Sequence, residues 1–182
     1  MKYSIDCLQS EIEKGKHFDY LFFWGHTPKR EGVVDKSCFS QWYPSPFVVD
    51  GITYSTAEHW MMAQKAKLFN DEEIFQKIVI TEKPAVVKAL GREVKNFDAD
   101  SWNASAYALV VEGNQHKFSQ DEKLKQFLLY TGDKVIVEAS PTDSIWSIGL
   151  SQDASEANNP FQWKGTNLLG FALMEVRDNL KK

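Results

Sequence analysis

Glu58 and Lys65 stand seven residues apart in a segment that is predicted to be helical. Seven residues make almost two turns at 3.6 residues per turn, so we expect both side chains on one face of that helix. A carboxyl group can donate or accept a proton, and a lysine amine can hold a phosphate or act as a nucleophile once its pKa is lowered. The pair is a candidate for acid–base chemistry on a nucleotide-like substrate.

Aromatic rings and a second acid lie in loops on either side of this helix in the sequence. Trp42 and Tyr43 precede it in a loop that two prolines stiffen, and flat rings can stack on a base or a sugar. Packing on the core explains these rings equally well. Asp143 and Trp146 follow an apolar strand, a place where ligands often bind in α/β-type sheets. An Asx turn made by Asp143 is the structural alternative.

Three of the polar candidates also have purely structural interpretations. Ser55 to Glu58 fits a capping box, with Ser55 as N-cap and Glu58 at the third helical position, worth roughly 1 kcal/mol. On the local pattern alone, this interpretation of Glu58 comes first. Lys65 would in the same way be a solvated helix lysine. Asn167 most simply caps the last helix, although a helix N-terminus can equally receive a phosphate.

Apolar periodicity and turn signals predict an α+β protein in which helices dominate and pack around a small sheet. We expect strands at 20–24, 47–50, 52–54 and 135–137, with Glu138 at the end of the last one. Asp50-Gly51 predicts a hairpin turn. Helices are expected at 55–69, from a cap at Asn70 or Asp71 to residue 78, at 84–91, at 101–118, from about 121 to 128, and at about 166–180.

Length and composition indicate one ordinary globular domain. The chain has 182 residues, of which 43% are hydrophobic and 25% charged, and it contains no repeat or linker-like tract. The first eighteen residues are interpreted as an N-terminal extension, and residues 19–182 as the domain. No pattern in the chain specifies an oligomeric state.

Charge and cysteine content exclude several classes of protein. The formal net charge is −4 and no run of Lys or Arg occurs, which argues against a general nucleic-acid binder. Cys7 and Cys38 form neither a disulfide framework nor a metal motif, and the four histidines lack metal-ligand spacing. No P-loop or GxGxxG occurs, so we expect no cofactor and no metal. Without an apolar run of membrane length or a signal peptide, we expect a cytoplasmic protein.

Taken together, these segments resemble the NADAR family, the YbiA-like N-glycosidases. The matching pieces follow the family order from about residue 20 to residue 180. They are Phe39-Ser40-x-Trp42-x-Pro44-Ser45-Pro46-Phe47, Asp50-Gly51, Tyr54-x-x-Ala57-Glu58-His59, Ala63-Gln64-Lys65-Ala66, Leu90-Gly91-Arg92, Trp102, Lys117-Phe118-x-Gln120, Leu129-x-Thr131-Gly132-Asp133, Val137-Glu138, Asp143-x-x-Trp146-x-x-Gly149 and Gly165-x-Asn167-x-Leu169-Gly170, with Met174 and Arg177.

The resemblance implies hydrolysis of an N-glycosidic bond between a ribose phosphate and a nitrogenous ring. The substrates it implies are small phosphorylated N-ribosides, the phosphoribosylamino-pyrimidine intermediates of riboflavin biosynthesis, which are reactive and are cleared as a form of metabolite damage control. The alternative enzyme removes ADP-ribose from guanine, in which case nucleic acid enters only as an ADP-ribosylated substrate. A hypothesis of another class is a non-catalytic module that binds ADP-ribose or a related nucleotide.

The resemblance also assigns roles to particular residues. It implies catalytic roles for Glu58, Lys65 and Asp143. Lys65 either forms a Schiff base at C1 of the ribose or neutralises a phosphate. Substrate contacts are expected from Trp42, Trp102, Trp146, Arg92 and Asn167. At Ser147 the chain departs from the glycine that the family often has after the tryptophan, which would narrow the site.

Overall fold

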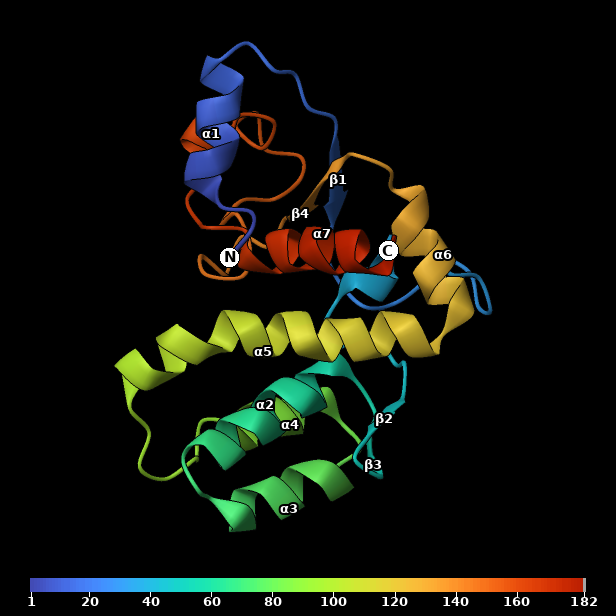
Figure 1. The fold of residues 1–182 in the computed structure, drawn as a ribbon, viewed down its shortest axis with the longest axis vertical. Helices are drawn as coiled ribbons and strands as arrows, with labels where there is room; N and C mark the ends of the chain where they lie inside the picture. Colours follow the sequence, from blue (N-terminus) through green and yellow to red (C-terminus); the bar gives the residue numbers. More distant parts are fainter. Residues whose placement is uncertain (182) are drawn as a thin grey trace.

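The structure is a computed structural model that describes residues 1–181. It has the α+β architecture expected from the sequence, with helices that dominate and four short strands in this part of the chain (Figure 1). In chain order the elements are α1 (Ile5–Glu13), β1 (Tyr20–Phe23), a 3-10 turn (Lys36–Phe39), β2 (Phe47–Val49), β3 (Ile52–Tyr54), α2 (Ala57–Leu68), α3 (Glu72–Ile80), α4 (Pro84–Leu90), α5 (Ala99–Gln120), α6 (Glu122–Tyr130), β4 (Val135–Glu138), a 3-10 turn (Pro160–Gln162) and α7 (Leu168–Leu180).

The four strands form two separate pairs. β1 and β4 are parallel, with Phe23 opposite Glu138 at their carboxyl ends. β2 and β3 make the predicted antiparallel hairpin. Its turn residues Asp50 and Gly51 both have positive φ, at 51° and 77°, as the tightest hairpin turns require. The parallel pair, and not the hairpin, thus ends with a carboxyl side chain, that of Glu138.

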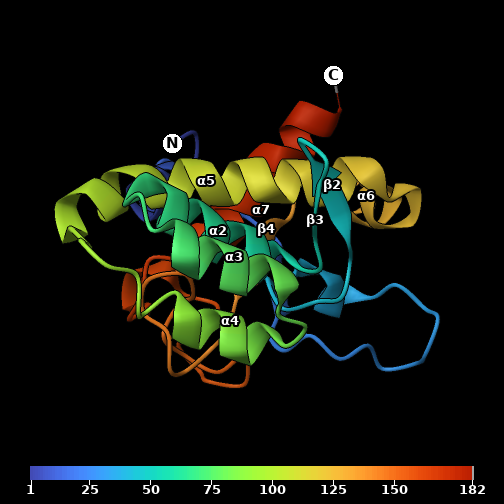
Figure 2. The same ribbon diagram turned by 90° about the horizontal axis from the view of Figure 1, so that it is seen from below.

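The long helix α5 crosses the molecule between two groups of elements (Figures 1 and 2). On one side it packs against α7, which in turn covers β4 and the parallel pair. On the other side it packs against α2, which also contacts α3 and α4. The buried core runs through both groups and includes Phe39, Phe118 and Phe171. The two groups approach one another closely enough for the charge of Glu58, on α2, to act on Glu138, at the end of β4.

The start of α2 differs from the predicted capping box. The N-cap is Thr56, whose Oγ1 accepts a hydrogen bond from the backbone N–H of His59 at 3.4 Å. Ser55 lies one residue too early because the hairpin extends through Tyr54. Glu58 is thus the second residue of the helix, and its carboxyl group is not engaged in the reciprocal bond of a capping box. The structural explanation for Glu58 that the local pattern favoured is wrong.

His59 fixes this helix start against the next helical unit. Its Nε2–H donates to the carbonyl of Thr81 at 2.8 Å, so its Nδ1 is left to accept from the Thr56 hydroxyl, also at 2.8 Å. The ring is 1% exposed, and burial lowers its pKa. A neutral, doubly bonded imidazole therefore locks the first turn of α2, the turn that carries Glu58.

The first eighteen residues, for which no element was predicted, contain α1. Leu8 on this helix is buried, and the Gln9 side chain donates to the carbonyl of Pro160 at 3.0 Å. The Tyr3 hydroxyl donates to Asp178 of α7 at 2.6 Å. The extension thus packs on the 151–165 loop and on α7. No helix within residues 1–181 is long and apolar enough to cross a membrane.

Candidate active site

Three carboxyl side chains from three different elements come together at the carboxyl end of the parallel strands. Glu58 belongs to the first turn of α2, Glu138 ends β4, and Asp143 lies in the loop that follows β4. They are close enough to act on one another electrostatically. The charge of Asp143 raises the pKa of both glutamates, and that of Glu58 raises the pKa of Glu138. Such clusters of mutually perturbed acids are typical of catalytic sites.

Glu58 is the most enclosed of the three, with 5% of its surface exposed. Burial raises the pKa of this carboxyl to about 7 and outweighs the positive charge of Lys88 and the hydrogen bond from Trp42, which both lower it. The nearby helix N-terminus also favours the carboxylate, but only modestly. Glu58 can therefore hold a proton near neutral pH and release it, as a general acid must.

Glu138 was not predicted as a site residue. Its backbone N–H donates to Asn167 Oδ1 at 3.0 Å, and its carbonyl accepts from Ser147 Oγ at 2.6 Å and from Ile148 N–H at 3.0 Å. Although part of the residue reaches solvent, burial is the main cause that raises its pKa to about 8. The one available signal was an acid that ends an apolar strand, within Val137-Glu138.

Asp143 makes the predicted Asx turn, and its catalytic role stays a prediction. One oxygen, Oδ1, accepts from the backbone N–H groups of Ile145 at 2.9 Å and Trp146 at 2.8 Å, which is the Asx turn. The residue is nevertheless partly exposed, and its charge reaches Glu58 and Glu138. The turn therefore does not prevent the carboxylate from acting on the two glutamates.

Trp42 joins this cluster from the loop before the β2–β3 hairpin. Its side chain is near enough to the Glu58 carboxyl to lower the pKa of that acid, and the flat faces of the indole are suited to ring contacts. The His26 ring lies 5.7 Å from the Trp42 ring, centroid to centroid, at an angle of 53°. The loop is anchored by Lys117 of α5, whose Nζ donates to the carbonyls of Cys38 and Ser40 at 2.6 and 2.9 Å.

Lys65 and Trp102 form a neighbouring group in which no carboxylate takes part. Lys65 Nζ donates to the carbonyl of Gly91 at 2.7 Å and lies 4.2 Å from the centroid of the Phe97 ring and 5.5 Å from that of the Trp102 ring. Burial lowers the pKa of this lysine. With a rise of about 1.5 Å per residue, the Lys65 Cα lies about 10 Å along α2 from that of Glu58. The two residues thus share a helix but have different contacts.

The remaining predicted substrate contacts occupy varied positions. Asn167 is fully buried, and its amide is used on β4, where Nδ2 donates to the carbonyl of Ile136 at 2.9 Å and Oδ1 accepts from Glu138. It lies before α7 with φ 53° and makes no side-chain cap. Trp146 is partly buried and packs on the core next to Asp143. Arg92 is exposed after α4, and its charge is not among those that shift the pKa values of the acids.

Ser147 is bonded entirely within the protein. Its hydroxyl donates to Glu138, lies 3.0 Å from the carbonyl of Ser140, and accepts from the Ser140 N–H at 2.6 Å. The residue has no exposed surface. The departure from the family's frequent glycine therefore reinforces the loop behind Glu138, and its side chain does not narrow the site.

Lys88 is a cation that lies near the acids, and the sequence did not single it out. Lys88, on α4, lowers the pKa of both Glu58 and Glu138 by its charge, and its Nζ lies 5.9 Å from the centroid of the Trp42 ring. Only proximity in three dimensions reveals it, because thirty residues separate it from Glu58 in the sequence.

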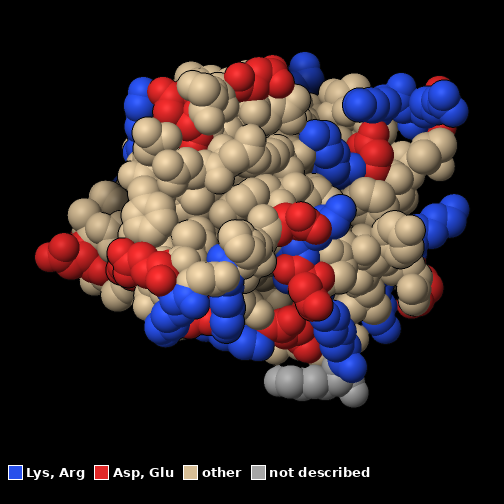
Figure 3. Space-filling view, turned by 90° about the horizontal axis from the view of Figure 1, so that it is seen from above, with Lys and Arg blue, Asp and Glu red and all other residues tan. Residues whose placement is uncertain are grey.

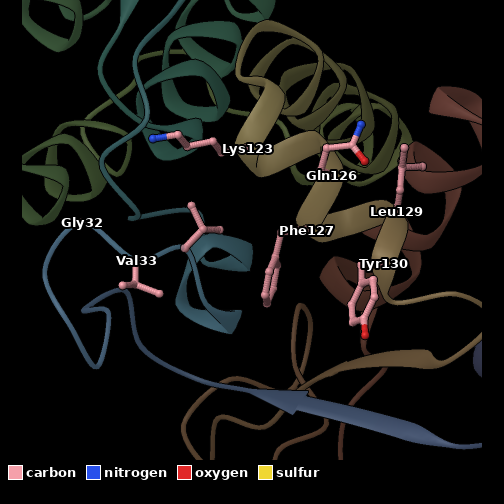
Figure 4. Close-up of a pocket in the computed structure, with 8 residues that line it drawn as sticks. Gly32, Val33, Lys123, Gln126, Phe127, Leu129 and Tyr130 are labelled. Carbon is pink, nitrogen blue, oxygen red and sulfur yellow. The ribbon is translucent and has the colours of Figure 1, made fainter.

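Other surface features lie apart from this site. A hollow of about 810 Å³ between residues 32–34 and α6 is lined by Val33, Phe127 and Tyr130 among others, and contains no acid (Figure 4). On the face seen in Figure 3, the described Lys and Arg side chains alternate with Asp and Glu and form no continuous basic stripe. Within residues 1–181 no group of three or more His, Cys, Asp or Glu side chains could hold a metal ion.

Comparisons with known proteins show the family to which the chain belongs. The model of the NADAR domain family matches residues 22–181. The chain is 43% identical to N-glycosidase R617 of Acanthamoeba polyphaga mimivirus over 164 residues, which is 87% of this chain and 95% of that protein. It is 32% identical to N-glycosidase YbiA of Escherichia coli K12 over 146 residues, 80% and 81% of the two chains. The NMR structure of E. coli YbiA superposes with a TM-score of 0.71 at 26% identity, over 91% of this chain and 87% of that one.

Proposed function

The chain belongs to the NADAR domain family, and from this premise we propose that it is an N-glycosidase that hydrolyses phosphoribosylamino-pyrimidines to ribose 5-phosphate and the free base. The observation that carries the proposal is the buried carboxyl of Glu58, whose pKa of about 7 lets it hold a proton at neutral pH. The curated relatives R617 and YbiA carry the name N-glycosidase. The domain that acts in this way is proposed to be residues 19–182.

In the proposed reaction the bond between C1 of the ribose and the exocyclic nitrogen breaks. Glu58 donates its proton to that nitrogen, so the base leaves as a neutral amine. Positive charge develops on the sugar, and Asp143 together with the ionised Glu58 stabilises it. Water supplies the hydroxyl of the product sugar, and its second proton returns to Glu58. Atoms and protons balance over one turnover.

Lys65 offers a covalent variant of the same reaction. A ribosylamine can open to an imine, and an unprotonated amine can exchange with it, forming a Schiff base on Lys65 while the free base leaves. Water then hydrolyses the Schiff base and regenerates the amine. The lowered pKa of Lys65 supports this variant, since it increases the unprotonated fraction. In the structure the Lys65 amine donates to the carbonyl of Gly91, so this variant requires the side chain to leave that bond and reach the substrate.

The base and sugar are proposed to lie against the aromatic residues. Trp42 is near enough to Glu58 to lower the pKa of its carboxyl, so a ring stacked on the indole would have its glycosidic nitrogen close to that carboxyl. The partly buried Trp146 follows Asp143 and would flank the same substrate. Stacking of this kind holds a heterocycle without a specific hydrogen bond to each of its polar groups.

The test is release of free base. Purified protein is incubated with a phosphoribosylamino-pyrimidine and, separately, with ADP-ribosylated guanosine, and mass spectrometry measures the released base. We expect release from the first substrate. Release from the second alone would assign the protein to ADP-ribose chemistry on guanine. Saturable binding of either substrate without release of its base would indicate a non-catalytic nucleotide-binding module.

A further inference from the structure

Lys88 occupies the solvent side of the carboxyl cluster. Its residue is exposed, whereas Glu58 is 5% exposed, and its Nζ lies 5.9 Å from the centroid of the Trp42 ring. The Trp42 side chain in turn is near enough to Glu58 to act on its carboxyl. From the interior to the solvent, the side chains are therefore the buried Glu58, the partly buried Trp42 and the exposed Lys88.

This lysine has no carboxylate partner within the described residues. The ion pairs closer than 4 Å in residues 1–181 involve other lysines, for example Lys77 and Lys95, which both contact Glu73. None of these pairs includes Lys88. Although Lys88 acts on Glu58 and Glu138 through space, its ammonium group is not neutralised by either of them, and it makes no hydrogen bond among the described residues.

The three acids around it create a problem for an anionic substrate. Asp143 acts on both glutamates through its negative charge, and Glu58 becomes negative when it gives up its proton, so a phosphate placed beside them would be repelled. A phosphorylated substrate therefore needs a cation outside this cluster. Lys88 meets that need, because it is near the acids, exposed and unpaired. An ammonium group is a compact charge with three donors, suited to phosphate oxygens.

We propose that Lys88 binds the phosphate of the substrate and makes the site select phosphorylated N-ribosides over their dephosphorylated counterparts. This inference rests on the proposed N-glycosidase function and adds a specificity residue to it. The sugar and base would lie on Trp42 beside Glu58, with the phosphate directed toward α4 and solvent. Arg92, also exposed, stays a predicted phosphate contact of its own, and its variant is a useful comparison.

The experiment compares two substrates that differ only in the phosphate. The wild-type chain, Lys88→Gln and Lys83→Gln are assayed on a phosphoribosylamino-pyrimidine and on the same compound without its phosphate. Lys83 is the matched control, because it is an exposed lysine next to α4 that makes no side-chain cap. Assays run at pH 6, below the pKa of about 7 for Glu58, so that the loss of a nearby positive charge leaves this acid protonated.

We expect Lys88→Gln to lower kcat/KM for the phosphorylated substrate by about tenfold or more, mainly through KM, and to change the dephosphorylated one little. Lys83→Gln should match the wild type on both. Equal losses on both substrates, or no loss on either, would overturn the inference. Titration calorimetry with ribose 5-phosphate and with ribose gives a second readout that needs no catalysis. Unchanged binding of ribose 5-phosphate by Lys88→Gln would overturn the role of Lys88, whereas absence of base release by the wild type counts against the proposed reaction alone.

Discussion

The backbone N–H of Glu58 donates to the carbonyl of Gln41 at 2.9 Å. This bond joins the first turn of α2 to the residue before Trp42, so the acid and the aromatic ring are positioned by the same contact. The Gln41 side chain is itself held by Asn114 of α5 at 2.9 Å. A change in the aromatic loop is therefore expected to move Glu58 as well, and the two should be treated as one unit.

The first prediction concerns Glu58→Gln. Because glutamine cannot donate a proton to the leaving nitrogen, we expect kcat to fall at least about 100-fold. Stability should not fall with it. Burial raises the pKa of Glu58 above its value in the unfolded chain, so the stability that this group contributes is present below about pH 4.5 and is lost as pH rises through about 7. At pH 8 the variant should thus unfold at the same or a higher temperature.

Glu72→Gln is the matched control for this variant. Glu72 is also in the first turn of a helix, α3, but it is exposed. Its substitution should leave turnover unchanged. Near wild-type turnover in Glu58→Gln, measured by base release in single-turnover and steady-state assays, would remove Glu58 from the mechanism.

The sequence predicted part of this site because some of its members are close together in the chain or lie at a strand end. The aromatic loop and α2 are consecutive, so Trp42 and Glu58 were expected near each other. Asp143 follows a strand, and such ends gather ligands. Glu138 and Lys88 were missed because their roles depend on packing: α4 places Lys88 over Trp42, and the parallel register places Glu138 beside Phe23. No local pattern encodes either contact.

The second prediction concerns the alkaline side of the pH–rate profile. If protonated Glu58 is the general acid, kcat/KM should decline as pH rises through its pKa of about 7. Lys88 lowers that pKa, so Lys88→Gln should move the decline to higher pH. Asp143 raises it, so Asp143→Asn should move the decline to lower pH, while the asparagine can still accept the bonds of the Asx turn. Opposite shifts are required, and a shift of both variants in one direction would contradict the assignment.

The third prediction is that Lys65 forms a covalent adduct. Borohydride reduces a Schiff base to a stable amine, so wild-type protein incubated with substrate and reductant should carry the mass of the reduced sugar on Lys65. Lys65→Arg keeps the positive charge but cannot form the imine, and it should show no adduct and lose most of its turnover. Lys67→Arg, an exposed lysine two residues away, is the control. Absence of an adduct together with turnover by Lys65→Arg would reduce Lys65 to the contacts seen with Gly91 and the rings.

The fold was predictable where short-range signals agree with the tertiary structure. Asp50-Gly51 specified the hairpin, Asp71 caps α3 as expected, α6 begins near Asp121 as expected, and Gly91 follows the end of α4. The cap of α2 was misassigned by one residue, because Ser55 and Thr56 are both good caps and only the length of the hairpin decides between them. The helix α1 was missed because its packing partners lie more than 140 residues away, at Pro160 and Asp178.

The fourth prediction tests how the aromatic loop is held. Lys117 is 1% exposed, burial lowers its pKa to about 8, and its amine donates to the carbonyls of Cys38 and Ser40. Both the charged and the neutral amine can make these two bonds. Lys117→Met fills similar space but leaves the carbonyls without this donor, so we expect the free energy of unfolding to fall by roughly 1–3 kcal/mol.

Trp42 lies two residues after Ser40, so the loss of the bond to Ser40 should displace the indole. The same variant should therefore also lose activity. Well below its unfolding temperature, where nearly all molecules are folded, kcat/KM should fall by about tenfold, as expected when a group that positions the reacting parts is displaced. Lys123→Met, at an exposed lysine of α6, should alter neither stability nor activity. If Lys117→Met were less stable yet kept its full kcat/KM, the lysine would support the core without positioning Trp42, and the bonds of Gln41 to Glu58 and Asn114 would suffice to hold the loop.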